Sequence, residues 1–181
     1  MTESDVTQEN YHSLEKANEY MSVHQFREFE QCPKRALAVL AGEHVRPKGE
    51  ALLFGSYVDK CLTESDETLA QFIKDTPELF TKSGQLRAPF KLADKCVQRI
   101  RNHGRARALV MGEGAQPQVV VTGTIDGVPW KGMMDVVFPE KNTFVDLKTT
   151  RSVGYIYDPE IGRRVEWWQQ YRMQMAVYQE L

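Results

Sequence analysis

The chain has 181 residues, of which 41% are hydrophobic and 27% are charged, and this is enough for one domain with its own hydrophobic core. A formal net charge of −2 argues against a protein that coats nucleic acid through bulk charge, so any contact with DNA has to come from a local basic patch. The N-terminus lacks the features of a signal peptide and no apolar run reaches membrane-spanning length, so we expect a cytoplasmic protein without a membrane partner.

Composition distinguishes the first 20 residues from the rest of the chain. Residues 1–20 are polar and predict a flexible segment, whereas residues 21–181 are expected to form a single domain. Ser22 precedes Gln25 by three positions, as in a capping box, and this predicts the start of a helix. The Cys32-Pro33 pair predicts a break before a further helical turn.

Two helices are predicted in the next part of the chain. The apolar run at 51–62 indicates a buried helix on which Gly55 and Asp59, four residues apart, share one face. Residues 91–109 predict a second helix. This helix carries the densest basic cluster of the sequence, which consists of Arg99, Arg101, Arg105 and Arg107. The cluster is either a solvated helix face or a surface that follows a phosphate backbone, and the sequence leaves both open.

From residue 118 the pattern changes to β-strands. Two β-prone runs flank Asp126-Gly127, a dipeptide typical of tight hairpin turns. A third run follows the PEKN turn at 139–142, so residues 118–150 predict a three-stranded meander. Asp135 lies on its second strand, and the third strand contains the sequence FVDLKTT with Asp146 and Lys148.

The pair of charges in this third strand admits two interpretations. Residues two apart in a strand point to the same side, so Asp146 and Lys148 are either a solvated edge or the lining of a polar cavity. If the strands pair across the PEKN turn, Asp135 lies near Asp146. Two close carboxylates in a partly dry site are costly unless a cation lies between them, and hard divalent ions such as Mg²⁺ prefer oxygen ligands of this kind.

The spacing of Asp135 and Asp146-Leu147-Lys148 resembles the signature of PD-(D/E)XK nucleases. A predicted helix at 165–181 places Trp167, Tyr171, Gln174 and Tyr178 on one face, which by itself also fits an amphipathic helix whose aromatic side chains pack in a core. Its Gln174-x-x-x-Tyr178 resembles the QxxxY element of the RecB-type branch of these nucleases. The phrases LLFGSYVDKCL, TGTIDGVPWKGMMD and FVDLKTT are most similar to the RecE-like exodeoxyribonuclease VIII group of PDDEXK-like phage-type exonucleases.

This resemblance covers residues 22–181 and implies a fold and an activity. The expected fold class is α/β (α+β), a restriction-endonuclease-like core with a mixed central sheet flanked by helices. The implied activity is hydrolysis of DNA phosphodiester bonds by an exonuclease that depends on Mg²⁺ or Mn²⁺. The preferred substrate is linear double-stranded DNA in phage-type homologous recombination, inside a bacterial host cell. The implied partners are DNA, a single-strand annealing protein and further copies of the chain in a ring.

The resemblance also assigns roles to individual residues. Asp135, Asp146 and Lys148 are the catalytic set. The metal ligands are Asp59, Asp135, Asp146 and the carbonyl of Leu147. Gln118 stands where the wider superfamily has an acidic ligand, which puts a second metal ion in doubt. The residues expected to position or steer DNA are Gln174, Tyr178, Arg99, Arg101 and Arg105.

Two alternatives remain within the same fold. The neutral Gln118 and the end of the chain three residues after Tyr178 are compatible with a truncated or non-catalytic DNA-binding module. An iron–sulfur nuclease of the RecB or CRISPR-adaptation type would use a cysteine near Cys32 and a cysteine cluster after the QxxxY helix. The sequence has three cysteines, Cys32, Cys61 and Cys96, and they do not form such a cluster.

Overall fold

The computed structural model describes residues 5–45, 49–158 and 162–181, and these residues divide into two compact units. The first unit comprises the described parts of Met1–Arg46, Val120–Met133 and Thr150–Leu181. The second comprises those of Pro47–Val119 and Met134–Thr149. The sequence predicts one domain over 21–181, and that assignment stays a prediction. No helix among the described residues has the length and apolar character needed to cross a bilayer.

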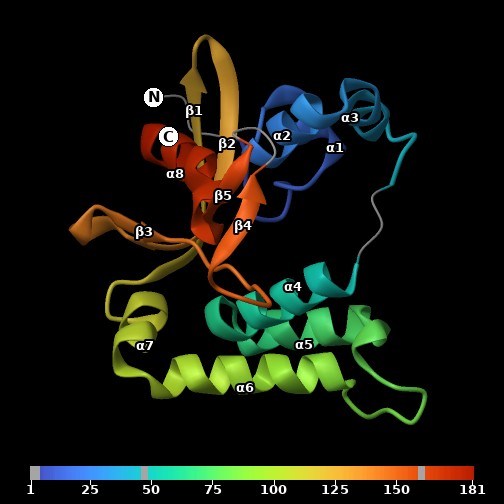
Figure 1. The fold of residues 1–181 in the computed structure, drawn as a ribbon, viewed down its shortest axis with the longest axis vertical. Coiled ribbons are helices and arrows are strands. Elements are labelled where there is room, and N and C mark those ends of the chain that lie inside the picture. The colour runs from blue at the N-terminus through green and yellow to red at the C-terminus, as the bar shows by residue number, and fades with distance from the viewer. Residues whose placement is uncertain (1–4, 46–48, 159–161) are drawn as a thin grey trace. The chain divides into compact units, whose positions relative to one another are not determined.

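Three of the four described helices of the first unit begin at a serine cap or at a proline. The four helices are α1 (Leu14–Glu19), α2 (Val23–Gln31), α3 (Pro33–Leu40) and α8 (Arg172–Glu180), as labelled in Figure 1. The Ser22 side chain accepts a hydrogen bond from the amide of Gln25 (3.3 Å) at the start of α2, and α3 begins at Pro33, as expected. Helix α1 lies within the segment predicted to be flexible, and its Lys16 is buried.

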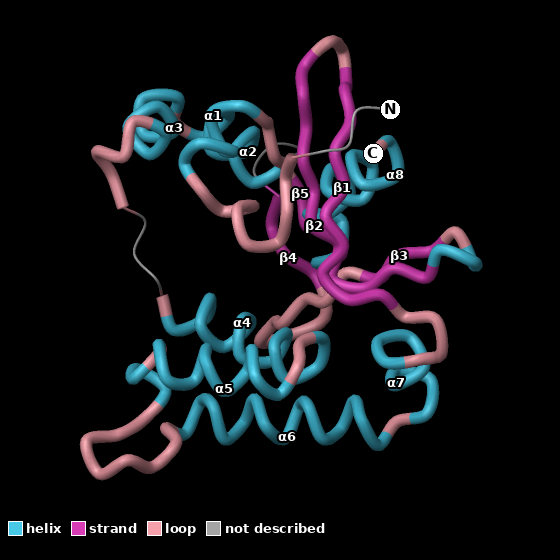
Figure 2. The backbone as a smooth tube through the Cα atoms, turned by 180° about the vertical axis from the view of Figure 1, so that it is seen from behind, coloured by secondary structure: helices cyan, strands magenta, loops and turns pink. Residues whose placement is uncertain are grey.

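The first unit also holds most of a long β-hairpin and a short two-stranded ribbon. Strands β1 (Gln116–Ile125) and β2 (Val128–Phe138) are joined at Asp126-Gly127, where both residues have positive φ angles of 51° and 79°, as the predicted tight turn requires. Figure 2 shows the two strands running side by side to this turn. Trp130, Val23 and Val177 form the buried core, which Phe26 also contacts.

Strands β4 (Tyr155–Asp158) and β5 (Arg163–Glu166) pair in the antiparallel sense and lead into the 3-10 helix η3 (Trp167–Tyr171). The sequence does not predict these strands. It predicts a single helix from 165, whereas the α-helix begins only at Arg172.

The second unit is a group of helices packed with the remaining ends of the hairpin strands. Figure 1 shows α4 (Glu50–Thr63), α5 (Asp66–Asp75) and α6 (Ala88–Asn102) side by side, and α7 (Gly104–Met111) follows α6. The short 3-10 helices η1 (Pro77–Leu79) and η2 (Pro139–Lys141) complete it. The core is built around Phe90, Leu79 and Val136, whose side chains are fully buried.

Two details of this unit differ from the prediction. The expected helix at 91–109 is two helices, because the His103 side chain accepts a hydrogen bond from the amide of Ala106 (3.2 Å) and starts a new helix. The third strand of the meander, β3, covers only Thr143–Val145. Asp146 and Lys148 therefore follow the strand instead of belonging to it. The order β1-β2-β3 is that of the predicted meander, and the α+β class is confirmed.

Candidate active site

Helix α4 supplies the first carboxylate of the site. Asp59 lies one turn after Gly55 on this helix. A Cβ atom on Gly55 would lie 3.3 Å from the Thr149 hydroxyl oxygen, so the glycine lets the helix approach the chain just after Lys148. This close approach gives a physical reason for the Gly-x-x-x-Asp pattern in the sequence.

Gln118 holds the Asp59 carboxylate from the start of β1. Its side-chain amide donates to both carboxylate oxygens of Asp59, at 3.2 and 3.0 Å, and lies 3.2 Å from the Thr63 hydroxyl. Gln118 is buried and has a φ of 51°, an uncommon backbone conformation for a residue other than glycine. Burial raises the pKa of Asp59, and the hydrogen bonds from Thr63 and Gln118 oppose this rise. The sequence predicts Gln118 near the metal site, and the geometry makes it a partner of Asp59.

Asp135 lies on β2, and the pairing of this strand brings it toward Asp146. In the antiparallel register of β2 with β3, Val136 faces Val145. The ladder ends at this pair, and the next residue on each side of it is Asp135 and Asp146, respectively. The Leu147 amide donates to the Asp135 carboxylate at 2.5 Å.

Asp135 has the most perturbed acid–base behaviour of the site. Burial raises the pKa of Asp135 to about 7, and the nearby charges of Asp59 and Asp146 act in the same direction. The Leu147 amide and the Lys148 ammonium lower it but do not cancel the rise. A carboxylate held in this way favours any cation that can share its charge.

Asp146 and Lys148 form an ion pair. The Asp146 side chain is 6% exposed and that of Lys148 is 25% exposed, so the pair is not the solvated edge that the sequence left open. The two charged side chains meet on one side of the chain although the strand has already ended at Val145.

The second unit has a cavity of about 290 Å³ where these residues meet. Its chemically active lining comes from α4, β2 and the segment after β3, and consists of Asp59, Asp135, Leu147, Lys148 and Thr149. Asp146 and Gln118 contact residues of this lining. Asp146 forms an ion pair with Lys148, and Gln118 donates hydrogen bonds to Asp59.

The oxygen donors of this cavity have the chemistry that Mg²⁺ or Mn²⁺ requires. In residues 5–45, 49–158 and 162–181, however, no three His, Cys, Asp or Glu side chains are close enough together to hold a metal ion. Each carboxylate has a protein partner instead: Gln118 for Asp59, the Leu147 amide for Asp135 and Lys148 for Asp146. The chemistry of these donors thus suits a hard divalent ion, but the three carboxylates have to leave these protein contacts and come closer together before they can hold one.

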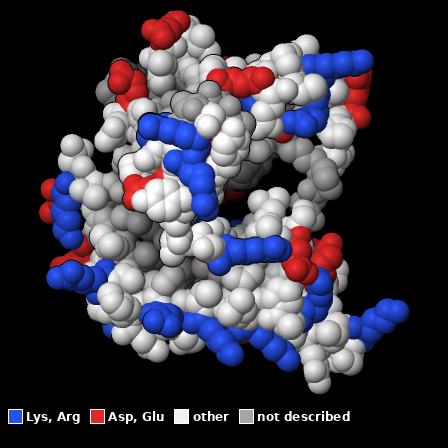
Figure 3. All heavy atoms as spheres, viewed as in Figure 1, with Lys and Arg blue, Asp and Glu red and all other residues white. Residues whose placement is uncertain are grey.

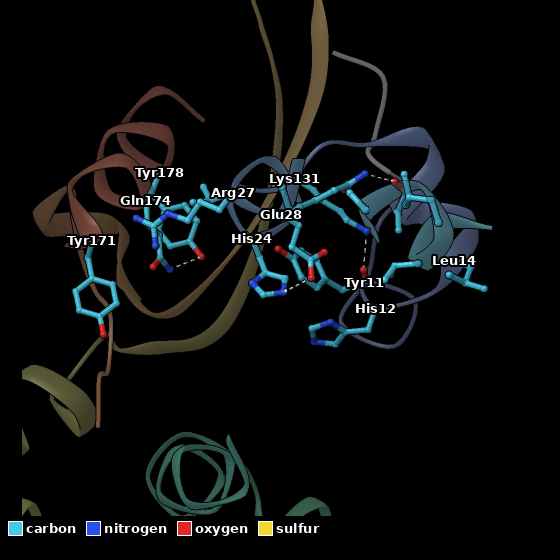
Figure 4. Close-up of a pocket in the computed structure, with 17 residues that line it drawn as sticks. Tyr11, His12, Leu14, His24, Arg27, Glu28, Lys131, Tyr171, Gln174 and Tyr178 are labelled. Carbon is cyan, nitrogen blue, oxygen red and sulfur yellow. Dashed lines mark hydrogen bonds and ion pairs between the residues drawn. The ribbon is translucent and has the colours of Figure 1, made fainter. Parts of the chain in front are cut away.

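Gln174 and Tyr178 lie in the first unit, on α8. The Gln174 amide donates to the Tyr178 hydroxyl (3.0 Å), which donates to the carbonyl of Met133 on β2 (2.9 Å). Both residues line a cavity of about 430 Å³ that Lys131, His24 and Glu28 also line, and Figure 4 shows the Gln174–Tyr178 pair at one side of it. Tyr178 is therefore held in place by the main chain of the strand that carries Asp135.

The basic cluster of the second unit is exposed on α6 and α7. Figure 3 shows Lys and Arg side chains following α6 along the lower edge of the view. Arg99 and Arg105 are exposed, whereas Arg101 also donates to the carbonyl of Cys61 on α4 (2.7 Å) and so supports the packing of two helices. Lys91 and Lys95 extend the surface, because they precede Arg99 at intervals of four residues on the same helix face.

Sequence reasoning missed three residues that shape these sites. Thr63 contacts Asp59 from the next turn of α4, and its i, i+4 spacing was a usable signal. Thr149 lies against Gly55, and Gly132 lies under Tyr178, where a Cβ atom would be 2.8 Å from the ring. The last two depend on contacts between distant parts of the chain and have no local signal.

Comparisons with known proteins place the chain in a family and a fold. A family model described as a PDDEXK-like domain of unknown function (DUF3799) matches residues 22–181. A solved structure of a "putative exonuclease" from Eubacterium rectale is similar to the chain with a TM-score of 0.85 and 36% sequence identity. The similarity covers 98% of this chain and 67% of that one. Among curated proteins no match was found.

Proposed function

Because the chain belongs to the PDDEXK-like family DUF3799, we propose that it is a deoxyribonuclease that hydrolyses phosphodiester bonds with Mg²⁺ or Mn²⁺. The observation that carries the proposal is the meeting of Asp59, Asp135 and Lys148 at one cavity, with Asp146 paired to Lys148. Lined by acidic oxygens and one ammonium group, this cavity suits a metal ion and a phosphate together.

In the proposed mechanism each residue has a separate task. Asp59, Asp135, Asp146 and the Leu147 carbonyl would hold the metal ion, and the chemistry that the ion would supply there is polarisation of a phosphate oxygen and a lower pKa for a water molecule. Lys148 orients the attacking water and stabilises the negative charge that develops on the phosphate. Gln118 keeps the Asp59 carboxylate in one orientation by contacting both of its oxygens.

The substrate and the setting are proposed from similar proteins and from the surface charge. The likeness to the Eubacterium rectale protein, which is named as an exonuclease, supports exonuclease action. The resemblance to RecE-like enzymes supports linear double-stranded DNA, a role in phage-type recombination, a single-strand annealing partner and a homo-oligomeric ring. The exposed Arg99 and Arg105 support contact with a phosphate backbone, and Gln174 and Tyr178 are the proposed positioning residues of the first unit.

Cleavage assays on linear and on circular duplex DNA distinguish an exonuclease from an endonuclease and from a non-catalytic DNA-binding module. We expect loss of linear DNA only, with Mg²⁺ or Mn²⁺ and not with EDTA, and we expect Asp146→Ala to abolish it. Glu140→Ala is the matched control, because it removes an exposed carboxylate from the same unit. Cleavage of circular DNA would indicate an endonuclease. A folded chain that binds DNA without cleaving it in any metal would instead support the non-catalytic module.

A further inference from the structure

The β4–β5 ribbon of the first unit has two chemically different faces. Ile156 pairs with Val165, which is 4% exposed, so this face packs inward. Side chains alternate along a strand, and the neighbouring pairs therefore point outward. These outward pairs are Tyr155 with Glu166 and Tyr157 with Arg164.

Two large aromatic rings on the outward face are open to solvent. Tyr155 is 64% exposed and Tyr157 is 65% exposed. Trp168, which is 50% exposed, follows β5 and donates its indole N–H to the Glu166 carboxylate at 2.8 Å. The outward face thus combines two exposed tyrosines with one guanidinium and one carboxylate, and this carboxylate accepts a hydrogen bond from the exposed Trp168 just after β5.

The spacing of the two tyrosines favours unpaired bases. Residues two apart in a strand are separated by about 6.6 Å, roughly twice the 3.4 Å rise per nucleotide of one duplex strand. Bases that stack on both rings must therefore be pulled apart from each other, which a single strand allows and a duplex does not. Aromatic platforms with a nearby cation are a common way to bind single strands without regard to sequence.

A protein partner fits this face less well. A stable protein interface needs about 800 Å² from each partner, and the outward face offers only four paired positions. Stacking of one base on an aromatic side chain contributes about 1–3 kcal/mol, so two tyrosines are sufficient for a measurable contact with DNA. Arg164, directly across from Tyr157, supplies a charge complementary to phosphate.

We propose that the outward face of the β4–β5 ribbon binds single-stranded DNA, with one base stacked on each of Tyr155 and Tyr157 and Arg164 contacting the phosphate backbone. This inference rests on the proposed function, because it takes DNA as the substrate. Tyr155 follows Lys148, the proposed catalytic lysine, by only seven residues in the sequence. The proposed DNA-binding face and the proposed active site are therefore carried by adjoining segments of the chain.

The test is binding of a fluorescently labelled oligodeoxythymidylate in EDTA, measured by anisotropy, so that no cleavage interferes. We expect Tyr155→Ala/Tyr157→Ala to weaken binding at least about tenfold. Tyr155→Phe/Tyr157→Phe keeps the rings and should bind like the unchanged chain. Leu37→Ala, which shortens an exposed apolar side chain of the same unit, is the matched control.

Unchanged oligonucleotide binding by the folded double alanine variant would overturn the proposal. A change in concentration-dependent molecular mass without a change in DNA binding would also overturn it, and would make the face a protein contact. The nuclease proposal is tested separately. If Asp146→Asn keeps oligonucleotide binding and loses cleavage, the assigned active site is supported, whereas cleavage by Asp146→Asn would reject the assigned active site and leave the ribbon result standing.

Discussion

Asp135 is the residue on which the electrostatics of the site converge. Its pKa is raised from the ordinary 3.8 to about 7, first by burial and then by the charges of Asp59 and Asp146. Between these two pH values the folded chain holds a proton that the unfolded chain has lost. In the absence of metal, this group therefore stabilises the fold at low pH, and the contribution is lost as the pH rises from about 4 to about 7.

Asp135→Asn removes this pH dependence. In EDTA at pH 8 we expect the variant to be more stable than the unchanged chain by about 1–3 kcal/mol, and we expect the difference to shrink toward pH 4. Added Mn²⁺ should raise the melting temperature of the unchanged chain and not that of the variant. Thermal melts over this pH range check the prediction, with Glu140→Gln as the control. Equal metal-induced shifts in both chains would contradict the role of Asp135.

A substitution at Gln118 tests whether Asp59 belongs to the proposed metal site. Gln118→Glu would place a second carboxylate against both oxygens of Asp59, so we expect a lower melting temperature in EDTA and a larger rise with Mn²⁺. Gln116→Glu makes the same chemical change at an exposed position of the same strand and should have little effect on either value. Similar melts for the two variants would show that repulsion at Asp59 is unimportant.

At the scale of elements, Gly132 on β2 determines how closely α8 approaches the strand. A Cβ atom there would lie 2.8 Å from the Tyr178 ring, so Gly132→Ala has to displace the ring and its hydrogen bond to the Met133 carbonyl. We expect a loss of about 1–3 kcal/mol in the free energy of unfolding. Gly154→Ala is the control in the same unit, because its Cβ atom would enter open space. Denaturant unfolding measures both, and equal stabilities would contradict this close packing of α8 on β2.

Two arginines on helix α6 are expected to have different roles, one in DNA binding and one also in the stability of the fold. Arg99→Ala should reduce the slope of log binding constant against log salt for duplex DNA by about one, with stability unchanged. Arg101→Ala should also lower stability, because Arg101 donates to the Cys61 carbonyl. Binding titrations at several salt concentrations, together with thermal melts, distinguish the two variants. A salt dependence unaffected by Arg99→Ala would mean that α6 is only a solvated helix face.

For the molecule as a whole, local chemistry explains what the sequence could predict. The Ser22 cap, the Cys32-Pro33 break and the Asp126-Gly127 turn depend on neighbouring residues and are found as expected. The break at His103 was missed because a histidine side chain caps α7, which is an uncommon use of that residue. The β4–β5 ribbon was missed because its strands are four residues long and gain their order from a partner strand.

In the candidate site, too, the features that depend on neighbouring residues were predicted and those that depend on distant contacts were not. The spacing of Asp135, Asp146 and Lys148 predicted that these residues act together, and the register of β2 with β3 accounts for the approach of Asp135 to the segment after β3. The contacts of Gln118 with Asp59 and of Gly55 with Thr149 join segments that are far apart in the sequence, so no local pattern could reveal them. The short length of β3 was also unexpected, because the residues after Val145 are β-prone. These residues do not continue the ladder, and the Leu147 amide donates to the Asp135 carboxylate instead.

The most direct test of the proposed active site is the single-turnover cleavage rate of linear duplex DNA by Lys148→Met with saturating Mn²⁺. Methionine keeps most of the length of the side chain and removes its charge. We predict a rate at least about 100-fold lower, with binding of the same DNA in EDTA within about twofold of the unchanged chain. Cleavage at the unchanged rate would contradict the assignment of this cavity as the active site.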